Sequence, residues 1–90
     1  MKFAVTHSIG APMKNFVYLF ETEKEAKEFL EREFERKVKE YITLFGEDSI
    51  LYGKSTDLLV ARIDWVWEDK TSSTMDEYWF GVVGDPNSPS

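Results

Sequence analysis

Residues 22–46 have the sequence TEKEAKEFLEREFERKVKEYITLFG, and this segment decides the fold class. Thr22 and Glu25 match the Ser/Thr-x-x-Glu pattern of an N-terminal capping box, and Gly46 is a typical C-terminal stop. The apolar residues between them recur three or four positions apart and share one stripe of a helix: Ala26, Phe29, Leu30, Phe34, Val38, Tyr41, Ile42 and Phe45. We therefore predict one amphipathic helix over residues 23–45, about 34 Å long at roughly 1.5 Å per residue.

The rest of the chain is rich in β-branched and aromatic residues, separated by Gly, Pro and polar segments. The predicted strands are residues 2–8, 15–20, 58–68 and 77–83, and residues 49–52 are a further candidate. Gly10 and Pro12 mark a turn between the first two strands, which predicts a hairpin. The polar residues 69–76 connect the last two strands, which we also expect to pair.

An apolar helix stripe requires another element to cover it. We therefore predict an α+β fold in the order ββαβββ, with one long amphipathic helix packed on one face of a four- or five-stranded, mostly antiparallel sheet. Residues 1–84 form the single domain in this prediction, and residues 85–90 form a flexible C-terminal tail.

Apolar and polar residues alternate along residues 58–68, so that Ile63, Trp65 and Trp67 share the face expected to lie under the helix. The predicted register pairs Trp67 with Tyr78, Trp65 with Phe80 and Ile63 with Val82 on that face, and Val66 with Trp79, Asp64 with Gly81 and Glu68 with Glu77 on the other. This register places like charges opposite each other and gathers acids at the loop end of the hairpin. Such repulsion lowers stability, which suggests a use for these acids.

The predicted partner-binding residues belong to this acidic surface: Asp64, Glu68, Asp69, Asp76, Glu77 and Trp79. A cluster of this kind is most often a solvated acidic turn. One alternative is a surface that binds a basic partner. The other is an oxygen-ligand site for Mg²⁺ or Ca²⁺, although the spacing of an EF-hand is absent from the sequence.

Composition limits the chemistry that the chain can support. The 90 residues carry a net charge of −6, and residues 46–90 account for it with nine acidic against three basic residues. Negative charge disfavours direct nucleic-acid binding, and the sequence has no glycine-rich phosphate-binding motif. The chain lacks cysteine and His7 is its single histidine, so nucleophilic catalysis and thiolate metal sites are poorly supported. We expect no enzyme activity, no cofactor and no bound metal.

Three features have both a structural and a functional interpretation. We interpret His7 as a packing or surface residue rather than a general base. Trp65 and Trp67 are interpreted as core residues rather than a platform for stacking nucleic-acid bases. The charged side of the helix is interpreted as a solvated face, with a coiled-coil partner surface as the alternative.

In size, charge and compactness the chain resembles the small acidic inhibitors made by phages, such as anti-CRISPR and anti-restriction proteins. The resemblance implies an inhibitor that imitates nucleic acid and occludes a basic surface of a nucleic-acid-handling protein. It assigns no residue roles, because it includes no motif. The alternatives are a structural module that homodimerises through a sheet edge or the sheet face away from the helix, and an enzyme or small-ligand binder.

Location is predicted from hydropathy. The sequence has no apolar run with the length of a membrane span or of a signal peptide. We therefore expect a cytoplasmic protein, in the host cytoplasm if a phage encodes it, that contacts neither a membrane nor nucleic acid directly.

Overall fold

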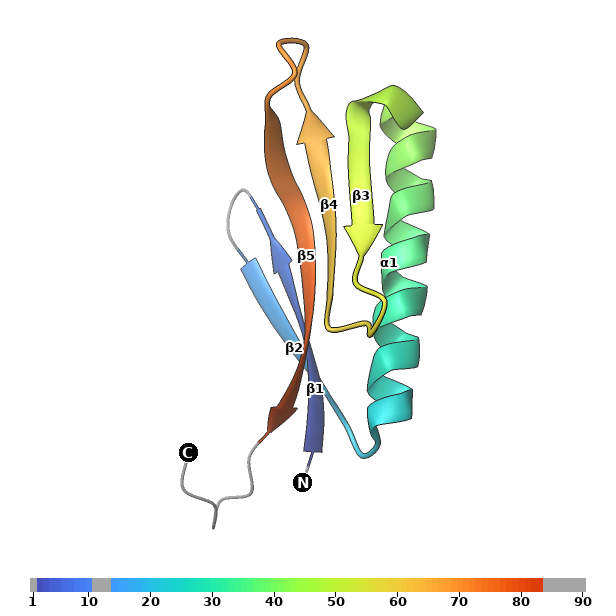
Figure 1. Ribbon diagram of the computed structural model, residues 1–90, viewed down its shortest axis with the longest axis vertical. Helices are drawn as coiled ribbons and strands as arrows, with labels where there is room; N and C mark the ends of the chain where they lie inside the picture. Colours follow the sequence, from blue (N-terminus) through green and yellow to red (C-terminus); the bar gives the residue numbers. More distant parts are fainter. Residues whose placement is uncertain (1, 11–13, 84–90) are drawn as a thin grey trace.

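The computed structural model describes residues 2–10 and 14–83, and within them one long α-helix lies against a five-stranded antiparallel sheet (Figure 1). The strands are β1 (Lys2–Ile9), β2 (Lys14–Phe20), β3 (Ile50–Lys54), β4 (Val60–Val66) and β5 (Ser72–Val83). The helix α1 spans Glu23–Phe45, and a short 3₁₀ helix, η1 (Glu47–Ser49), connects it to β3. The predicted α+β fold and the order ββαβββ are confirmed, and the candidate strand near residue 50 belongs to the sheet. The predicted tail, residues 85–90, and part of the predicted turn, residues 11–12, lie outside the described residues.

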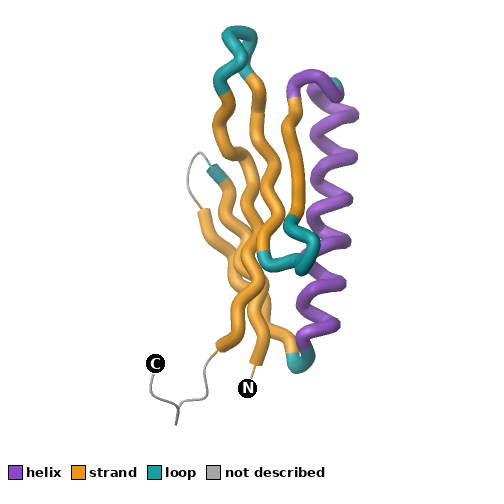
Figure 2. Tube along the Cα trace, viewed as in Figure 1, coloured by secondary structure: helices purple, strands orange, loops and turns teal. Residues whose placement is uncertain are grey.

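The strand order in the sheet is β2-β1-β5-β4-β3, so β5 is central and β2 and β3 are the edges. Figure 2 shows α1 on one side of the sheet only. The sheet face turned away from α1 is called the outer face here, and its exposed apolar residues include Val17, Leu19 and Trp79. The predicted hairpin of the first two strands is confirmed, because β1 and β2 pair antiparallel from Phe3 opposite Phe20 to Ile9 opposite Lys14.

The helix begins and ends where its sequence predicts. Thr22 is the N-cap in an extended conformation, and its Oγ1 accepts a hydrogen bond from the backbone N–H of Glu25 at 3.1 Å. At the other end Gly46 has φ 90°, a left-handed value that favours glycine and stops the helix. These two residues set where α1 begins and ends along the chain.

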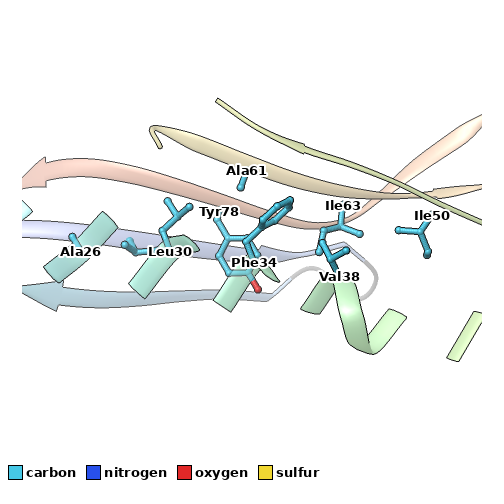
Figure 3. Close-up of a cluster of buried hydrophobic side chains, with 9 residues drawn as sticks. Ala26, Leu30, Phe34, Val38, Ile50, Ala61, Ile63 and Tyr78 are labelled. Atoms are coloured by element: carbon cyan, nitrogen blue, oxygen red, sulfur yellow. The ribbon is translucent and has the colours of Figure 1, made fainter. Parts of the chain in front are cut away.

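The hydrophobic core lies between α1 and the sheet (Figure 3). Four buried helix residues, Ala26, Leu30, Phe34 and Val38, follow the predicted stripe. They pack against buried residues of the strands: Val5, Ile50, Ala61, Ile63 and Tyr78. At the end of the predicted stripe Phe45 is 46% exposed and contacts Trp65 at the margin of the core.

The predicted register of the last hairpin is wrong. Ile63 lies opposite Asp76 rather than Val82, a shift of six residues along β5. Arg62 lies opposite Glu77, so opposite charges face each other where like charges were expected. The predicted polar loop 69–76 is mostly strand, since β5 already begins at Ser72.

A tight turn causes this difference. The N–H of Trp67 donates to the carbonyl of Thr71 at 2.8 Å, and the N–H of Lys70 donates to the carbonyl of Trp67 at 2.9 Å. Lys70 has φ 72°, in the left-handed position that such a turn usually gives to glycine. Because a lysine occupies that position, the sequence carries no glycine to mark the turn.

A β-bulge between Ile63 and Asp64 interrupts the pairing of β4 with β5. Asp76 lies opposite Ile63 and Thr74 lies opposite Asp64, so Met75 is the extra residue. Its carbonyl accepts a hydrogen bond from the N–H of Gly10 at 2.8 Å, which ties the end of β1 to the bulge. The bulge therefore lies next to Asp76, the one fully buried acid of the described chain.

Within residues 2–10 and 14–83, no helix combines the length and the apolar character that crossing a membrane requires.

Candidate functional site

The six predicted partner-binding residues lie in three different places. Asp76 is fully buried between the sheet and α1, whereas Asp64 is 6% exposed on the outer face, where its Oδ1 accepts a hydrogen bond from Arg62 Nε at 2.9 Å. Glu77 and Trp79 alternate with Tyr78 on β5 and belong to the outer face. Glu68 and Asp69 are exposed in the turn between β4 and β5. The prediction that Glu68, Asp69, Asp76 and Glu77 gather at the hairpin end is therefore wrong for Asp76 and Glu77, because it rested on the wrong register.

Asp76 is the centre of a buried polar network between α1 and the sheet. His7 Nε2, on β1, lies 2.5 Å from Asp76 Oδ1, and the Tyr41 hydroxyl, on α1, donates a hydrogen bond to Asp76 Oδ2. Burial favours the neutral carboxyl, but the hydrogen bonds from His7 and Tyr41 outweigh burial and lower the pKa of Asp76 below its usual value. Asp76 is therefore a carboxylate held by two donors from different elements.

Two members of the network, His7 and Asp76, are buried, and Tyr41 is partly buried. His7 is 7% exposed, and its ring stacks on Tyr78 with centroids 4.2 Å apart and planes 12° apart. The carboxylate of Asp76 has no exposed surface, so a substrate does not reach it. We interpret the network as a structural connection between helix and sheet, and the interpretation of His7 as a packing residue agrees with this placement.

The sequence predicted His7 to be a packing or surface residue and gave no indication of its partner, Asp76. The missing signal was the register of β5, which brings Asp76 opposite Ile9 and Tyr78 opposite His7. With a shorter predicted turn, Asp76 would belong to the last strand. It would then face inward like Tyr78, because residues two apart on a strand share a face.

The end of the molecule with the turn between β4 and β5 carries exposed acids whose charge no basic side chain of the described residues neutralises. Figure 1 shows this turn and the C-terminus of α1 at the same end. The exposed acids here are Glu47, Asp48, Glu68 and Asp69, which we call the acidic end. Among the described residues none of these four carboxylates forms an ion pair, whereas most helix acids do, for example Glu23 with Lys27 and Glu33 with Arg36.

The C-terminus of α1 strengthens the negative potential of the acidic end. The C-terminus of a helix carries roughly half a negative charge from its aligned peptide dipoles. The last turn of α1 contains no basic residue that would offset this charge. Lys70 is the one basic residue in the turn between β4 and β5, which gives the acidic end and Lys70 together a net charge of −3.

Asp69 is held in a fixed position within the acidic end. Its Oδ1 accepts hydrogen bonds from the backbone N–H of Thr71 at 3.0 Å and from the Thr71 hydroxyl at 2.6 Å. The hydroxyl bond and then the backbone bond lower the pKa of Asp69, so its carboxyl stays ionised. Because both bonds go to Oδ1, Oδ2 points to no donor among the described residues.

The outer face is a second exposed surface, with apolar rather than acidic character. Thr6 lies opposite Val17 on one side and opposite Trp79 on the other, so these residues form a row across three strands. Val17 and Trp79 are 62% and 49% exposed. Gly81 lies beside this row, and a Cβ built on it would meet no atom within 4 Å, so the surface is open there.

Within the described chain, no three His, Asp or Glu side chains come together as they would around a metal ion. Comparisons of the chain with family models, with curated proteins and with solved structures found no match.

Proposed function

We propose that this protein is a small acidic inhibitor that binds and occludes a basic surface of a nucleic-acid-handling protein. In this proposal the acidic end makes the contact, and its carboxylates take the place of backbone phosphates, as in the phage inhibitors that the chain resembles in size and charge. The proposed role includes no catalytic step and belongs in the cytoplasm.

One observation carries the proposal: the four acids of the acidic end, which form no ion pair among the described residues, lie at the same end of the molecule as the C-terminus of α1. Duplex DNA carries about one negative charge per 1.7 Å of axis, and basic grooves are built to neutralise such charge. Four carboxylates on two neighbouring turns offer a basic groove a comparable short patch. The acidic end replaces the wider set of residues expected from the sequence, because Asp64 and Asp76 are buried.

The test is affinity capture from a lysate of the source organism or its host, with three columns compared. The first column carries the wild type and the second carries E47Q, D48N, E68Q and D69N together. The third carries four neutralised acids from elsewhere on the exposed surface: Glu21, Glu28, Glu35 and Asp57. The two variants have equal net charge and differ in where it is removed, with the control removing the ion-paired acids Glu21, Glu28 and Glu35.

We expect the wild type and the third column to retain a nucleic-acid-binding protein that elutes as salt rises, and the second column to lose it. The recovered protein must then lose DNA binding when wild type is added. The proposal fails if all three columns retain the same proteins, or if the recovered partner and its DNA bind unchanged in the presence of wild type.

A second candidate function, homodimerisation, is favoured by the exposure of the edge strand β2. Its residues Phe16, Val17, Tyr18 and Leu19 are all exposed and apolar, and β2 is hydrogen-bonded to β1 on one side only. A long apolar edge is a template for pairing with a second copy of the chain.

Sedimentation at rising concentration separates the two candidates. Leu19→Lys changes a residue of β2 that is 59% exposed, and Leu44→Lys changes a comparable residue on α1 that is 64% exposed. If β2 pairs with itself, the wild type and Leu44→Lys dimerise and Leu19→Lys stays monomeric. A wild type that remains monomeric throughout excludes this candidate.

A further inference from the structure

An open groove lies beside the acidic end, where β4 continues past the start of β3. Ile50, the first residue of β3, lies opposite Trp65, and from Val66 onward β4 has no partner on that side among the described residues. The groove is lined by η1, by the end of β4 and by the turn that follows it: Ser49, Trp65, Val66, Trp67, Glu68, Asp69 and Thr71. Two indole rings and two carboxylates therefore share one concave surface.

The aromatic part of the groove is braced from the helix side. Trp65 contacts Phe45 edge to face, with centroids 5.1 Å apart and planes at 89°. Trp67 contacts Trp65 in the same manner at 6.0 Å and 74°, and its Nε1 donates to Ser73 Oγ at 3.0 Å. Trp67 is nonetheless 53% exposed. A large aromatic ring that is fixed in place and half open to solvent suits a ligand that stacks on it.

The acidic part of the groove is fixed as well. Thr71 holds Asp69 through Oδ1 and leaves Oδ2 available, while Glu68 is exposed and without an ion pair among the described residues. A positively charged group in the groove would therefore meet an aromatic ring and an ionised carboxylate at once. A cation gains from both, since the face of an indole ring carries negative potential.

We propose that this groove binds an arginine side chain presented by a basic protein partner. Arginine fits better than lysine because its planar guanidinium stacks on an aromatic ring while its N–H groups bind a carboxylate in a fork. The inference rests on the proposed function, which supplies the basic partner, and it goes further by naming the side chain that the acidic end recognises.

The probe is the blocked tripeptide acetyl-Gly-Arg-Gly-amide, compared with its lysine and citrulline counterparts at low ionic strength. Citrulline keeps the shape of arginine but has no charge. The readout is the indole N–H signals of the full-length, ¹⁵N-labelled protein. Trp67 and Trp65 line the groove, and Trp79 on the outer face is an internal control.

We expect the arginine peptide to shift the Trp67 signal saturably at millimolar concentration, the lysine peptide to bind less tightly, and citrulline to leave the spectrum unchanged. Replacing Trp67 by leucine or Asp69 by asparagine should each weaken arginine binding about two- to five-fold, the size of an exposed cation–π contact or charge pair. Asp57→Asn changes a similarly exposed turn aspartate far from the groove and should leave the affinity unchanged. For the Trp67 variant, affinity is followed at the Trp65 signal.

Two results would overturn the inference. Equal binding of arginine and lysine peptides, unaffected by the Trp67 substitution, would show unselective charge attraction and leave the proposed function intact. Absence of any shift with the arginine peptide, with or without loss of the partner on the capture columns, would remove the groove as an arginine site. Failure of the wild-type column to capture a nucleic-acid-binding protein, with retained arginine selectivity, would instead refute the proposed function alone.

Discussion

Tyr41 on α1 donates a hydrogen bond to the buried carboxylate of Asp76 on β5, and these residues are 35 positions apart in the chain. The bond connects the C-terminal half of the helix to the central strand of the sheet. His7 holds the other oxygen of the same carboxylate from β1. Three elements are therefore joined at one acid, which makes this network a sensitive point for stability.

Removal of the Tyr41 hydroxyl should destabilise the fold. Tyr41→Phe leaves the ring in place but removes one donor from an ionised, buried acceptor, at a cost of about 1.5–3 kcal/mol. The free energy of unfolding, measured by urea denaturation at neutral pH, should fall by this amount without a change in the m-value.

The effect of Tyr41→Phe should depend on pH. The folded-state pKa of Asp76 lies below its usual value, so the stability that its charge contributes is complete above the unfolded-state pKa of about 3.9 and is lost as pH falls through the lower folded-state pKa. The difference in unfolding free energy between the wild type and Tyr41→Phe should therefore be constant at neutral pH and shrink in the acid range. A difference that stays constant down to the acid transition would contradict the assigned network.

Tyr78→Phe, in contrast to Tyr41→Phe, should not lower the stability of the fold. The Tyr78 hydroxyl is buried and has no hydrogen-bond partner among the described residues, and such an unsatisfied group costs about 1–3 kcal/mol. Tyr78→Phe removes it and keeps the ring that stacks on His7. We expect an unchanged or raised melting temperature, and a clear decrease would mean that the hydroxyl has a partner.

Lys70 should be replaceable by glycine with a gain in stability. Its φ of 72° is costly for a residue with a Cβ, by about 1–2 kcal/mol, and part of this cost is recovered in Lys70→Gly despite the greater freedom of glycine in the unfolded chain. Lys70→Ala is the control, because alanine keeps the Cβ and should give no gain. Thermal unfolding of the two variants checks the turn assignment directly.

Gly10 should tolerate no side chain. A Cβ at this position would lie 2.3 Å from the carbonyl oxygen of Thr74, so the end of β1 would have to move away from the bulge. Gly10→Ala should cost about 1–3 kcal/mol, as overpacking does. Gly53→Ala should be nearly neutral in the same denaturation experiment, since its Cβ would meet no atom within 4 Å.

The helix could be predicted from the sequence because its signals are local. Thr22, Gly46 and the spacing of the apolar residues each act within a few positions, and all three agree. The first hairpin was also predictable, because a short connection leaves few possible registers. These elements account for the correct fold class and element order.

The register of β4 and β5 was not predictable in the same way. Trp65 and Trp67 can pair with several aromatic residues on the same face of the last strand. The hydrophobic pattern alone therefore allows registers that differ by two, four or six residues. The turn and the bulge decide between these registers. The turn is hard to recognise in the sequence, because Lys70 occupies the position where glycine is expected. The candidate site changed with the register: Glu68 and Asp69 stayed at the surface, and Asp76 moved into the core.

The turn between β4 and β5 lies beyond the last residues of the core, and its conformation depends on Asp69, Thr71 and backbone bonds within the turn itself. The turn residues thus set the register of β4 and β5 through their backbone, while the side chains of Glu68 and Asp69 stay exposed to solvent. Glu68 and Lys70 can change identity with little effect on the core. Under the proposed function, a lineage that carries this scaffold could change its partner by substituting a few exposed turn side chains, while the network around Asp76 keeps the architecture constant.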